Sequence, residues 1–500
     1  MNFGRILAKR SYLTPDKVAL VFEGNRYTYF QLNNRANRLA NALLGKGLKP
    51  GDRAAVLLFN CPEYLEIYFA LAKVGIAMVP LNFRMAAPEL EYILKDSMPK
   101  AIFFGAEFTE LIEKTDKYDV ELCCIVGDKE ADFLEYEKLI VEGASTEAYI
   151  EYDSSETQLI MYTSGTTGRP KGAMLSHNNS TWNAINTAAD FGIRPDDITL
   201  SSAPLFHIGG LNVLTTPHFY LGATIVLTRE FDPENIWRLV DKEGITNMFA
   251  VPQMYQLMAQ DPSRHQYRHD SLRFVESGGG PCPIPLIMQY FDEINVMFMQ
   301  GYGLTEASPS TTLLRSEDAL RKAGSIGKPF LHVDVKVVDE TGDEVRPGEV
   351  GELLVRGPTV MSGYWQLSQE TSDSIRDGWL YTGDLARFDE EGYFYIVDRK
   401  KDMIISGGEN IYPAEIEQVL YTHPKVSEAA VVGIPDDKWG EAVKAFIVVK
   451  EGQELSEEEV ISCCRENLAG YKKPKHVQFI KELPRNASGK VLKRILREHT

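Results

Sequence analysis

The chain has 500 residues, a formal net charge of −18 and 44% hydrophobic residues. The length predicts more than one domain, and the composition is that of an ordinary globular protein. The acidic balance argues against a nucleic-acid-binding protein. No apolar run reaches the roughly 20 residues that a membrane-spanning helix needs, and the first residues lack the apolar core of a secretory signal. We therefore expect no transmembrane segment.

The six cysteines form no CxxC pair. Without a secretory signal they are typical of reduced thiols, which predicts a cytoplasmic protein. The sequence leaves open a weak peripheral contact with a membrane and a homodimer.

In chain order, helical stretches alternate with short apolar runs over most of the length. Residues 27–47 have a helical pattern, and the apolar runs include "DRAAVLLF" (52–59) and "AIFFG" (101–105). This alternation predicts parallel sheets with helices on both faces. From residue 333 the sequence alternates apolar and polar residues around Thr341-Gly342, which predicts an antiparallel hairpin.

We therefore expect an α/β fold with a large N-terminal domain over residues 1–398. This domain would contain parallel-rich sheets with helices and a β-barrel-like subdomain. A hinge at residues 399–401 would lead to a small α+β lid domain over residues 402–500, a compact block with its own helices and strands.

The stretch "YTSGTTGRPKG" (162–172) follows an apolar run and combines glycines, hydroxyl side chains and two cations. Glycine lets the backbone approach a ligand closely, and exposed N–H groups with hydroxyls form a concavity for phosphate oxygens. The spacing does not fit the GxxxxGK[ST] loop. The residues alone predict a phosphate-binding loop, with a polar surface loop as the alternative.

Further motifs follow in order: "PLFHIGG" (204–210), "ESGGGPCP" (276–283), "QGYGLTE" (300–306), "YTGDL" (381–385), "DRKKD" (398–402) and "PRNASGKVLKR" (484–494). Over its whole length the chain resembles the adenylate-forming acyl-CoA synthetases, whose relatives include luciferases and the adenylation domains of peptide synthetases. Within them it looks most like bacterial medium- and long-chain fatty-acid–CoA ligases. It is nearly as similar to aryl-CoA ligases of the feruloyl, benzoate or succinylbenzoate type.

The resemblance implies two steps in one site. The acid and ATP first give acyl-AMP and pyrophosphate, and CoA then displaces AMP to give the thioester. The implied co-substrates are the acid, ATP and CoA, with Mg²⁺ and no tightly bound prosthetic group. A carboxylate that attacks ATP brings two anions together, so the site needs cations.

The resemblance assigns Tyr302 to the adenine, Thr305 to the α-phosphate and Glu306 to Mg²⁺, with Asp384 and Arg399 on the ribose. The full set of implied ATP- and AMP-binding residues is Thr163, Ser164, Gly165, Thr166, Thr167, Gly168, Lys171, Gly278, Gly279, Gly280, Gln300, Gly301, Tyr302, Asp384 and Arg399. The implied catalytic residues are Lys490, Thr305, Glu306 and His207.

Lys490 lies far along the chain from the phosphate loop, so the C-terminal domain must close over the site to deliver it. The resemblance places the hinge at Lys401. The residues implied for CoA are Gly407, Gly408, Trp439, Tyr471, Lys473 and Lys475. Residues 461–500 carry ten Lys and Arg against three acidic residues, which suits a polyanionic ligand.

The implied acid pocket contains His207, Gly209, Phe249, Val251 and Gly303. No bulky side chain follows Tyr302, and Gly209 with Gly210 would add space, so we expect an open pocket. This favours a medium- or long-chain fatty acid, with an aryl acid as the alternative. More remote alternatives are an amino-acid-adenylating enzyme, disfavoured by His207 where an aspartate is expected, and a non-catalytic nucleotide-binding protein, disfavoured by the presence of Glu306 and Lys490.

Overall fold

The computed structural model describes residues 2–117, 119–128, 133–163, 169–280, 282–406, 409–436, 438–485 and 491–498. The chain divides into two compact units. The first contains Met1–Val335 and Val355–Leu380, and the second contains Lys336–Leu354 and Tyr381–Thr500.

The first unit has a nine-stranded sheet in the order β16-β15-β14-β13-β12-β10-β11-β1-β2. Its inner strands, from β14 to β1, pair in parallel, as the alternating pattern predicts. The strands are β1 (Val18–Phe22), β2 (Asn25–Thr28), β10 (Ile198–Ser201), β11 (Thr224–Leu227), β12 (Asn247–Ala250), β13 (Phe274–Ser277), β14 (Met297–Gly303), β15 (Ser310–Leu314) and β16 (Lys328–Pro329).

A second, eight-stranded sheet of the same unit has the order β19-β9-β8-β4-β3-β5-β6-β7. It is parallel from β8 to β7, and β9 returns antiparallel to β8. The strands are β3 (Arg53–Leu57), β4 (Ala77–Pro80), β5 (Ala101–Gly105), β6 (Leu122–Val126), β7 (Leu134–Glu135), β8 (Thr157–Thr163), β9 (Lys171–Ser176) and β19 (Gly363–Tyr364).

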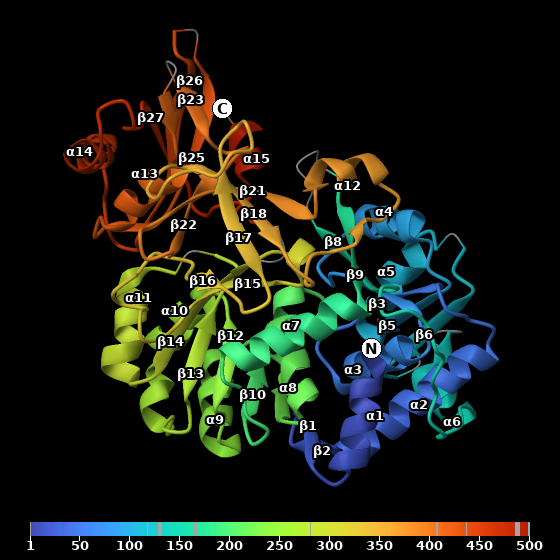
Figure 1. Ribbon diagram of the computed structural model, residues 1–500. Helices are drawn as coiled ribbons and strands as arrows, with labels where there is room; N and C mark the ends of the chain where they lie inside the picture. Colours follow the sequence, from blue (N-terminus) through green and yellow to red (C-terminus); the bar gives the residue numbers. More distant parts are fainter. Residues whose placement is uncertain are drawn as a thin grey trace. The chain divides into compact units, whose positions relative to one another are not determined.

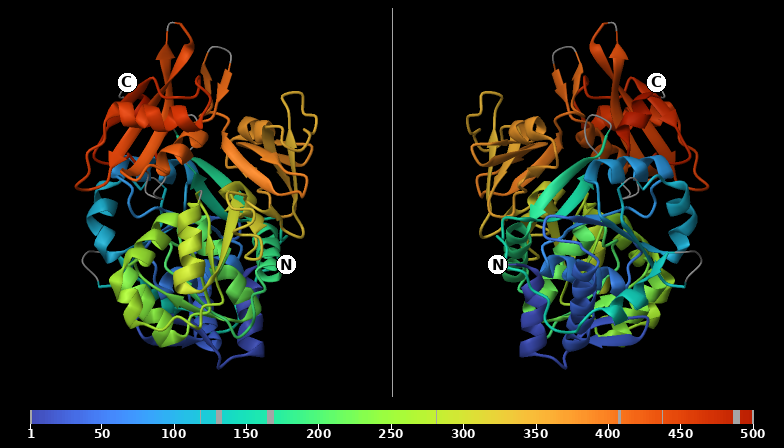
Figure 2. Two further views of the ribbon diagram at one scale, coloured as in Figure 1. Left: turned by 90° about the vertical axis from the view of Figure 1, so that its left-hand side faces the viewer. Right: turned by 90° about the vertical axis from the view of Figure 1, so that its right-hand side faces the viewer.

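Helices flank both sheets (Figures 1 and 2). They are α1 (Gly4–Leu13), α2 (Tyr29–Gly45), α3 (Pro62–Lys73), α4 (Ala87–Ser97), α5 (Thr109–Lys114), α6 (Tyr136–Glu142), α7 (His177–Asp190), α8 (Thr215–Leu221), α9 (Pro233–Glu243), α10 (Pro252–Gln260), α11 (Ile284–Gln289) and α12 (Ser368–Ser374). One hydrophobic core joins the two sheets through α3 and α8, where the ring centroids of Phe69 and Phe219 lie 5.1 Å apart. Helix α2 begins at a capping box, in which the Thr28 hydroxyl accepts from the Gln31 N–H.

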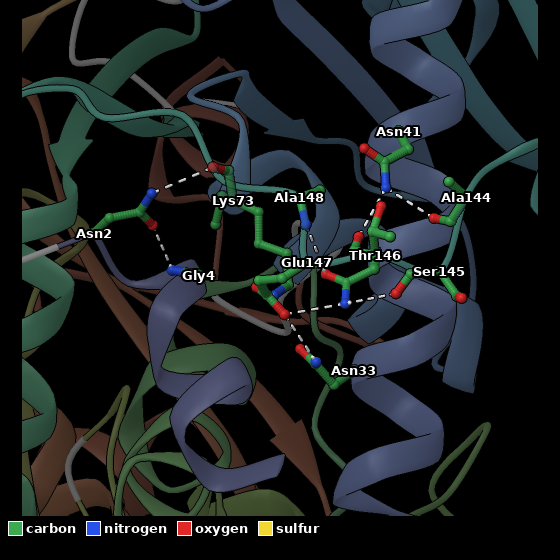
Figure 3. Close-up of polar contacts among 12 residues, drawn as sticks. Asn2, Gly4, Asn33, Asn41, Lys73, Ala144, Ser145, Thr146, Glu147 and Ala148 are labelled. Carbon is green, nitrogen blue, oxygen red and sulfur yellow. Dashed lines mark hydrogen bonds and ion pairs between the residues drawn. The ribbon is translucent and has the colours of Figure 1, made fainter. Parts of the chain in front are cut away.

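A polar network fastens the segment between α6 and β8 to helices α2 and α3 (Figure 3). Lys73 is 1% exposed and forms an ion pair with Glu147. Asn33 and Asn37 donate to the other oxygen of Glu147 at 3.1 and 3.0 Å. Burial lowers the pKa of Lys73, and Glu147 opposes that shift. The network thus satisfies a buried cation that would otherwise destabilise the fold.

A smaller sheet has the open order β17-β18-β21-β20, with β22 paired to β21. It occupies the region expected to be barrel-like, but the pairing of these described strands does not close into a barrel. Its strands are β17 (Asp334–Val338), β18 (Gly351–Arg356), β20 (Ile375–Arg376), β21 (Trp379–Phe388) and β22 (Phe394–Arg399). Val338 and Glu344 form an antiparallel bridge, which confirms the turn predicted at Thr341-Gly342.

The second unit also contains a sheet in the order β24-β23-β26-β25, with β27 paired to β26. Its elements are β23 (Ile404–Ser406), β24 (Glu409–Ile411), α13 (Pro413–Tyr421), β25 (Val426–Asp436), β26 (Gly440–Val449), α14 (Glu457–Asn467), β27 (His476–Phe479) and α15 (Lys493–Glu498). The predicted α+β character of this part of the chain is confirmed. The predicted hinge at residues 399–401 lies inside the second unit and stays a prediction.

All six cysteines are free thiols. Among the described residues, no helix combines the length and the apolar character that crossing a membrane requires.

Candidate active site

The phosphate-loop motif connects two paired strands of the first unit. Thr163 at the end of β8 and Lys171 at the start of β9 are register partners. The hairpin is fixed to helix α4, since the Tyr162 hydroxyl donates to the Asp96 carboxylate and the Tyr92 hydroxyl donates to the Pro170 carbonyl at 3.1 Å. The predicted residues Ser164, Gly165, Thr166, Thr167 and Gly168 lie outside the described residues.

Glu306 lies beside the ends of this hairpin. Its Oε1 accepts hydrogen bonds from the Thr163 hydroxyl at 3.3 Å and from the Tyr364 hydroxyl at 3.0 Å. The Lys171 ammonium lies 5.4 Å from the centroid of the Tyr364 ring. The structure therefore brings together three of the predicted residues, Thr163, Lys171 and Glu306, from two sheets.

Tyr364 is a residue of this cluster that the sequence analysis missed. Burial and the neighbouring Glu306 raise the pKa of Tyr364, which keeps its hydroxyl a neutral donor. Strand β19, which contains Tyr364, pairs with β9 and so places the ring beside Lys171. In the sequence, Tyr364 stands in the short stretch "SGYW" (362–365). This stretch does not reveal the role of Tyr364, because the residues that Tyr364 contacts, Glu306 and Lys171, are distant along the chain.

The turn that contains Thr305 and Glu306 is held by hydrogen bonds to the segment that precedes β19. Residues Thr305–Ala307 form a single 3₁₀ turn after β14, and Ser308 ends it with a left-handed φ of 71°. The Ser308 hydroxyl donates to the Thr359 carbonyl at 2.7 Å, and the Met361 N–H donates to the Glu306 carbonyl at 2.8 Å. The segment before β19 thus fixes the turn, so Tyr364 and Glu306 are positioned together.

The predicted adenine slot lies where three parallel strands end. Phe249 in β12, Glu276 in β13 and Met299 in β14 are register partners and therefore share one face of the sheet. A Cβ on Gly278 would lie 3.3 Å from the Phe249 ring and 3.3 Å from the Gly301 carbonyl oxygen. The predicted residues Phe249, Gly278 and Gly301 are therefore neighbours at the carboxyl ends of these strands.

Other residues predicted to bind the nucleotide lie along the same edge of the sheet. A Cβ on Gly279 would lie 3.5 Å from Val251, whereas a Cβ on Gly280 would meet nothing within 4 Å. Gln300 is buried, and Tyr302, near the end of β14, is partly buried. Carboxyl ends of parallel strands are where open α/β sheets bind their ligands.

The acid-pocket motif meets this edge at Phe249. A Cβ on Gly209 would lie 3.1 Å from the Phe249 ring and 3.2 Å from His207 Nδ1. His207 Nδ1 also accepts from the Gly209 N–H at 3.1 Å. Residues Gly209–Val213 form a π-helical turn, a local geometry common at functional sites. The structure therefore brings His207, Gly209 and Phe249 together.

Two other glycines do not support an open pocket. A Cβ on Gly303 would lie 1.8 Å from the Pro309 carbonyl oxygen, and a Cβ on Gly210 would lie 2.3 Å from the Pro204 carbonyl oxygen. Both positions need glycine because backbone passes close by. We expected Gly303 and Gly210 to leave space for the acid. That expectation is not supported, because backbone already fills the space that a side chain at either position would take.

The two residues predicted to bind ribose meet within the second unit. Asp384 in β21 and Arg399 in β22 are register partners, and Arg399 Nε lies 2.7 Å from Asp384 Oδ1. Asp384 is buried and Arg399 is partly exposed. Lys400 forms an ion pair with Glu352 at 2.8 Å while its side chain stays exposed, and the predicted hinge residue Lys401 is also exposed.

The residues predicted to bind CoA are partly brought together in the second unit. The Lys475 ammonium lies 5.1 Å from the centroid of the exposed Trp439 ring and 3.3 Å from an Asp436 oxygen. Tyr471 is exposed, and Lys473 is partly buried. Gly407, Gly408 and Lys490 lie outside the described residues.

A magnesium ion fits the chemistry of the Glu306 cluster. Mg²⁺ is commonly held by one or two carboxylates together with substrate phosphates. In the part of the chain that the structure describes, no group of three or more His, Cys, Asp or Glu gathers into a self-sufficient metal site. The Glu306 carboxylate supplies a hard ligand beside the phosphate hairpin, and the Thr163 and Tyr364 hydroxyls orient it by donating to its Oε1.

Comparisons with known proteins identify the family of this chain. The chain matches the model for "AMP-binding enzyme" over residues 7–365 and that for "AMP-binding enzyme C-terminal domain" over residues 415–490. It is 42% identical to a feruloyl-CoA synthase from Amycolatopsis, covering 97% of this chain and 96% of that protein. It is 39% identical to the long-chain-fatty-acid–CoA ligase FadD13 of Mycobacterium tuberculosis, covering 99% and 98%.

Among solved structures, the o-succinylbenzoate CoA synthetase (MenE) of Bacillus subtilis in complex with the acyl-adenylate OSB-AMP has a TM-score of 0.89 at 34% identity, covering 98% of this chain and 97% of that one. The same enzyme with ATP and a magnesium ion has a TM-score of 0.88 at 34% identity, covering 98% of each chain. The chain belongs to the AMP-binding enzyme family, among the acyl-CoA synthetases of the adenylate-forming superfamily.

Proposed function

We propose that the protein activates an aryl carboxylic acid with ATP, giving an acyl-AMP and pyrophosphate, and then transfers the acyl group to CoA. The observation that carries the nucleotide chemistry is the contact of Glu306 with Thr163 and Tyr364 at the ends of the phosphate hairpin. Support for an aryl acid comes from the relatives. The feruloyl-CoA synthase is the more identical of the two named above, at 42% against 39%, which favours the aryl alternative over the fatty acid that the sequence first suggested.

In this proposal the hairpin loop cradles the β- and γ-phosphates, and the Lys171 cation offsets their charge. Glu306 would hold Mg²⁺ through its carboxylate, and a bound Mg²⁺ would offset the negative charge of the phosphates that the substrate's own carboxylate must approach. The Tyr364 hydroxyl orients Glu306 by donating to Oε1. Thr305 binds the α-phosphate, and Tyr302 with the Gly278–Gly280 edge contacts the adenine.

The second unit would supply the remaining groups. Asp384 and Arg399 bind the ribose hydroxyls, and Lys490 holds the acid carboxylate and the α-phosphate. Thioester formation would then use the face that contains Gly407, Gly408 and Trp439, with Tyr471, Lys473 and Lys475 at the CoA nucleotide. Because the two steps need different groups of one domain, we propose a rotation about Lys401 between them.

A fatty acid is the second candidate. It is favoured by the Mycobacterium tuberculosis relative, which aligns over 99% of this chain. Phe249, Val251 and Met299 would offer an apolar surface to an alkyl chain.

The free thiols and the reaction are consistent with the cytoplasmic location that we propose.

The test is acid-dependent pyrophosphate release, with kcat/KM measured for ferulate, benzoate, octanoate, palmitate and acetate at fixed ATP and Mg²⁺. The proposal expects an aryl acid to have the highest kcat/KM and acetate to be poor. Octanoate or palmitate far ahead of both aryl acids would assign the enzyme to the fatty-acid ligases. Pyrophosphate release that no acid accelerates would contradict the adenylating function itself.

A further inference from the structure

Glu276 is an acidic side chain set among hydrophobic ones at the ligand-binding edge of the nine-stranded sheet. It is 2% exposed, and its register partners on the two adjacent strands are Phe249 and Met299. Its Oε1 would lie 3.3 Å from a Cβ on Gly278 and 2.3 Å from a Cβ on Gly301. The carboxyl group therefore fills the room that side chains at these two glycines would need.

The two oxygens of Glu276 are not equally satisfied. A backbone hydrogen bond from Gly301 reaches the carboxyl group, yet Oε2 is buried and has no hydrogen-bond partner among the described residues. A buried polar atom without a hydrogen-bond partner destabilises a fold, because it loses its contact with water and gains nothing in return. Such an atom in a native protein calls for an explanation.

A second buried glutamate of the same unit shows what a structural carboxylate looks like here. Glu66 is 1% exposed, and its two oxygens are occupied by Arg35 Nε at 2.6 Å and the Tyr136 hydroxyl at 2.8 Å. Within the described parts of the chain, no such cation acts on Glu276. Burial therefore raises the pKa of Glu276 to about 8, and the Gly301 hydrogen bond offsets only part of that rise. At neutral pH the group is mainly a neutral acid, able both to donate and to accept.

The carboxyl group also adjoins the acid pocket. The Phe249 ring lies within 3.1 Å of the Cβ position of Gly209 on the His207 side and within 3.3 Å of that of Gly278 on the Glu276 side. His207, Phe249 and Glu276 thus follow one another around a single edge. A substituent on a bound acid that passes the Phe249 ring would meet the Glu276 carboxyl.

We propose that the Glu276 carboxyl hydrogen-bonds a hydroxyl group on the acid substrate and so selects hydroxylated aryl acids over unsubstituted ones. The inference rests on the proposed function. A phenolic hydroxyl can donate to and accept from a neutral carboxyl group, which would complete the bonding of Oε2. A saturated alkyl chain or an unsubstituted ring would leave that oxygen unpaired, and a site built for a hydroxyl discriminates strongly against an analogue without one.

The experiment compares cinnamate with its 2-, 3- and 4-hydroxy derivatives, measuring kcat/KM for pyrophosphate release in the wild type, Glu276→Gln and Glu276→Leu. In the wild type, at least one hydroxy derivative should exceed cinnamate by on the order of tenfold or more. Glu276→Gln keeps a donor and an acceptor and should retain most of this preference. Glu276→Leu keeps an apolar volume and should bring the ratio close to one, mainly by losing activity on the hydroxy acid.

A purely structural role would give another pattern. If Glu276→Leu lowers kcat/KM for cinnamate and its hydroxy derivatives equally, or if the wild type treats all four acids alike, the inference is overturned. The wild-type comparison stands even if the Leu variant does not fold, which thermal unfolding would reveal. A wild type that adenylates none of the acids tested would instead count against the proposed function.

Discussion

Glu306 and Glu276 place two carboxyl groups of the first unit in opposite surroundings. Glu306 is partly exposed and accepts hydrogen bonds from Thr163 and Tyr364. Glu276 is buried between Phe249 and Met299, and its Oε2 lacks a hydrogen-bond partner within the described parts of the chain. Donors around a carboxylate stabilise its charge, whereas an apolar setting favours the neutral acid.

The difference indicates a division of labour. A charge-bearing carboxylate beside the phosphate hairpin can serve the same nucleotide whichever acid is bound. A neutral carboxyl at the edge of the acid pocket can act only on acids that reach it. Changes on the nucleotide side should therefore affect all acids alike, and changes at Glu276 should affect them unequally.

The largest effect is expected from Lys490→Ala. If Lys490 offsets charge while the carboxylate meets ATP, its loss should slow adenylation by on the order of 10²–10³ and spare thioester formation from supplied acyl-AMP. Pyrophosphate release and acyl transfer are measured separately, with Lys481→Ala, an exposed lysine of the same unit, as the control. Wild-type pyrophosphate release by Lys490→Ala would refute the assignment.

Glu306→Gln tests the nucleotide side of the comparison directly. Removing the charge should slow pyrophosphate release by on the order of 10²–10³, because that charge holds the metal at the phosphates. The loss should be the same for every acid. Glu317→Gln, at an exposed position of the same unit, is the control, and a loss confined to some acids would break the proposed division.

Tyr364→Phe should have a smaller effect on the same side. It removes one hydrogen bond to Glu306 and keeps the ring beside Lys171. Groups that orient a metal ligand typically contribute about 10- to 100-fold, and we expect about tenfold, mostly as a raised Mg²⁺ requirement. Titration of activity with Mg²⁺ measures it, and a rate loss that excess Mg²⁺ leaves untouched would assign Tyr364 another role.

The last prediction concerns stability, not activity. Burial raises the pKa of Glu276 from 4.5 to about 8, so between these pH values the folded chain keeps a proton that the unfolded chain has released. The stability from this group is therefore present below pH 4.5 and is lost as pH rises toward 8. Because glutamine cannot ionise, the free energy of unfolding of Glu276→Gln should rise relative to that of the wild type as pH increases, by up to about 1.4 kcal/mol per pH unit.

Denaturant unfolding of both proteins at pH 5, 6.5 and 8 measures this difference. A difference in the free energy of unfolding that does not change with pH would show that Glu276 is ionised in the folded protein throughout.

The sequence predicted what adjacent residues determine. The parallel strands and the "QGYGLTE" motif are recognisable in the sequence. The structure places Glu306 beside Thr163, and the Tyr364 ring that contacts Lys171 also donates to Glu306. Tyr364 was missed because its contact with Glu306 spans 58 residues. Glu276 belongs to the "ESGGGPCP" motif. The sequence does not reveal that Glu276 is buried, or that its Oε2 lacks a hydrogen-bond partner among the described residues, because both follow from the alignment of three strands. For Gly303 and Gly210 the expectation of open space was wrong for a local reason. The carbonyl oxygens that exclude a side chain there, of Pro309 and Pro204, lie close along the chain, and only the folded turn brings them near.

The most direct test of the adenylating chemistry is detection of the intermediate. The protein is incubated with ATP, Mg²⁺ and a hydroxylated aryl acid without CoA, quenched, and analysed by mass spectrometry. We predict an acyl-adenylate that accumulates with pyrophosphate and disappears into acyl-CoA and AMP when CoA is added. Formation of ADP and phosphate, or of a thioester without any preceding adenylate, would contradict the proposed reaction.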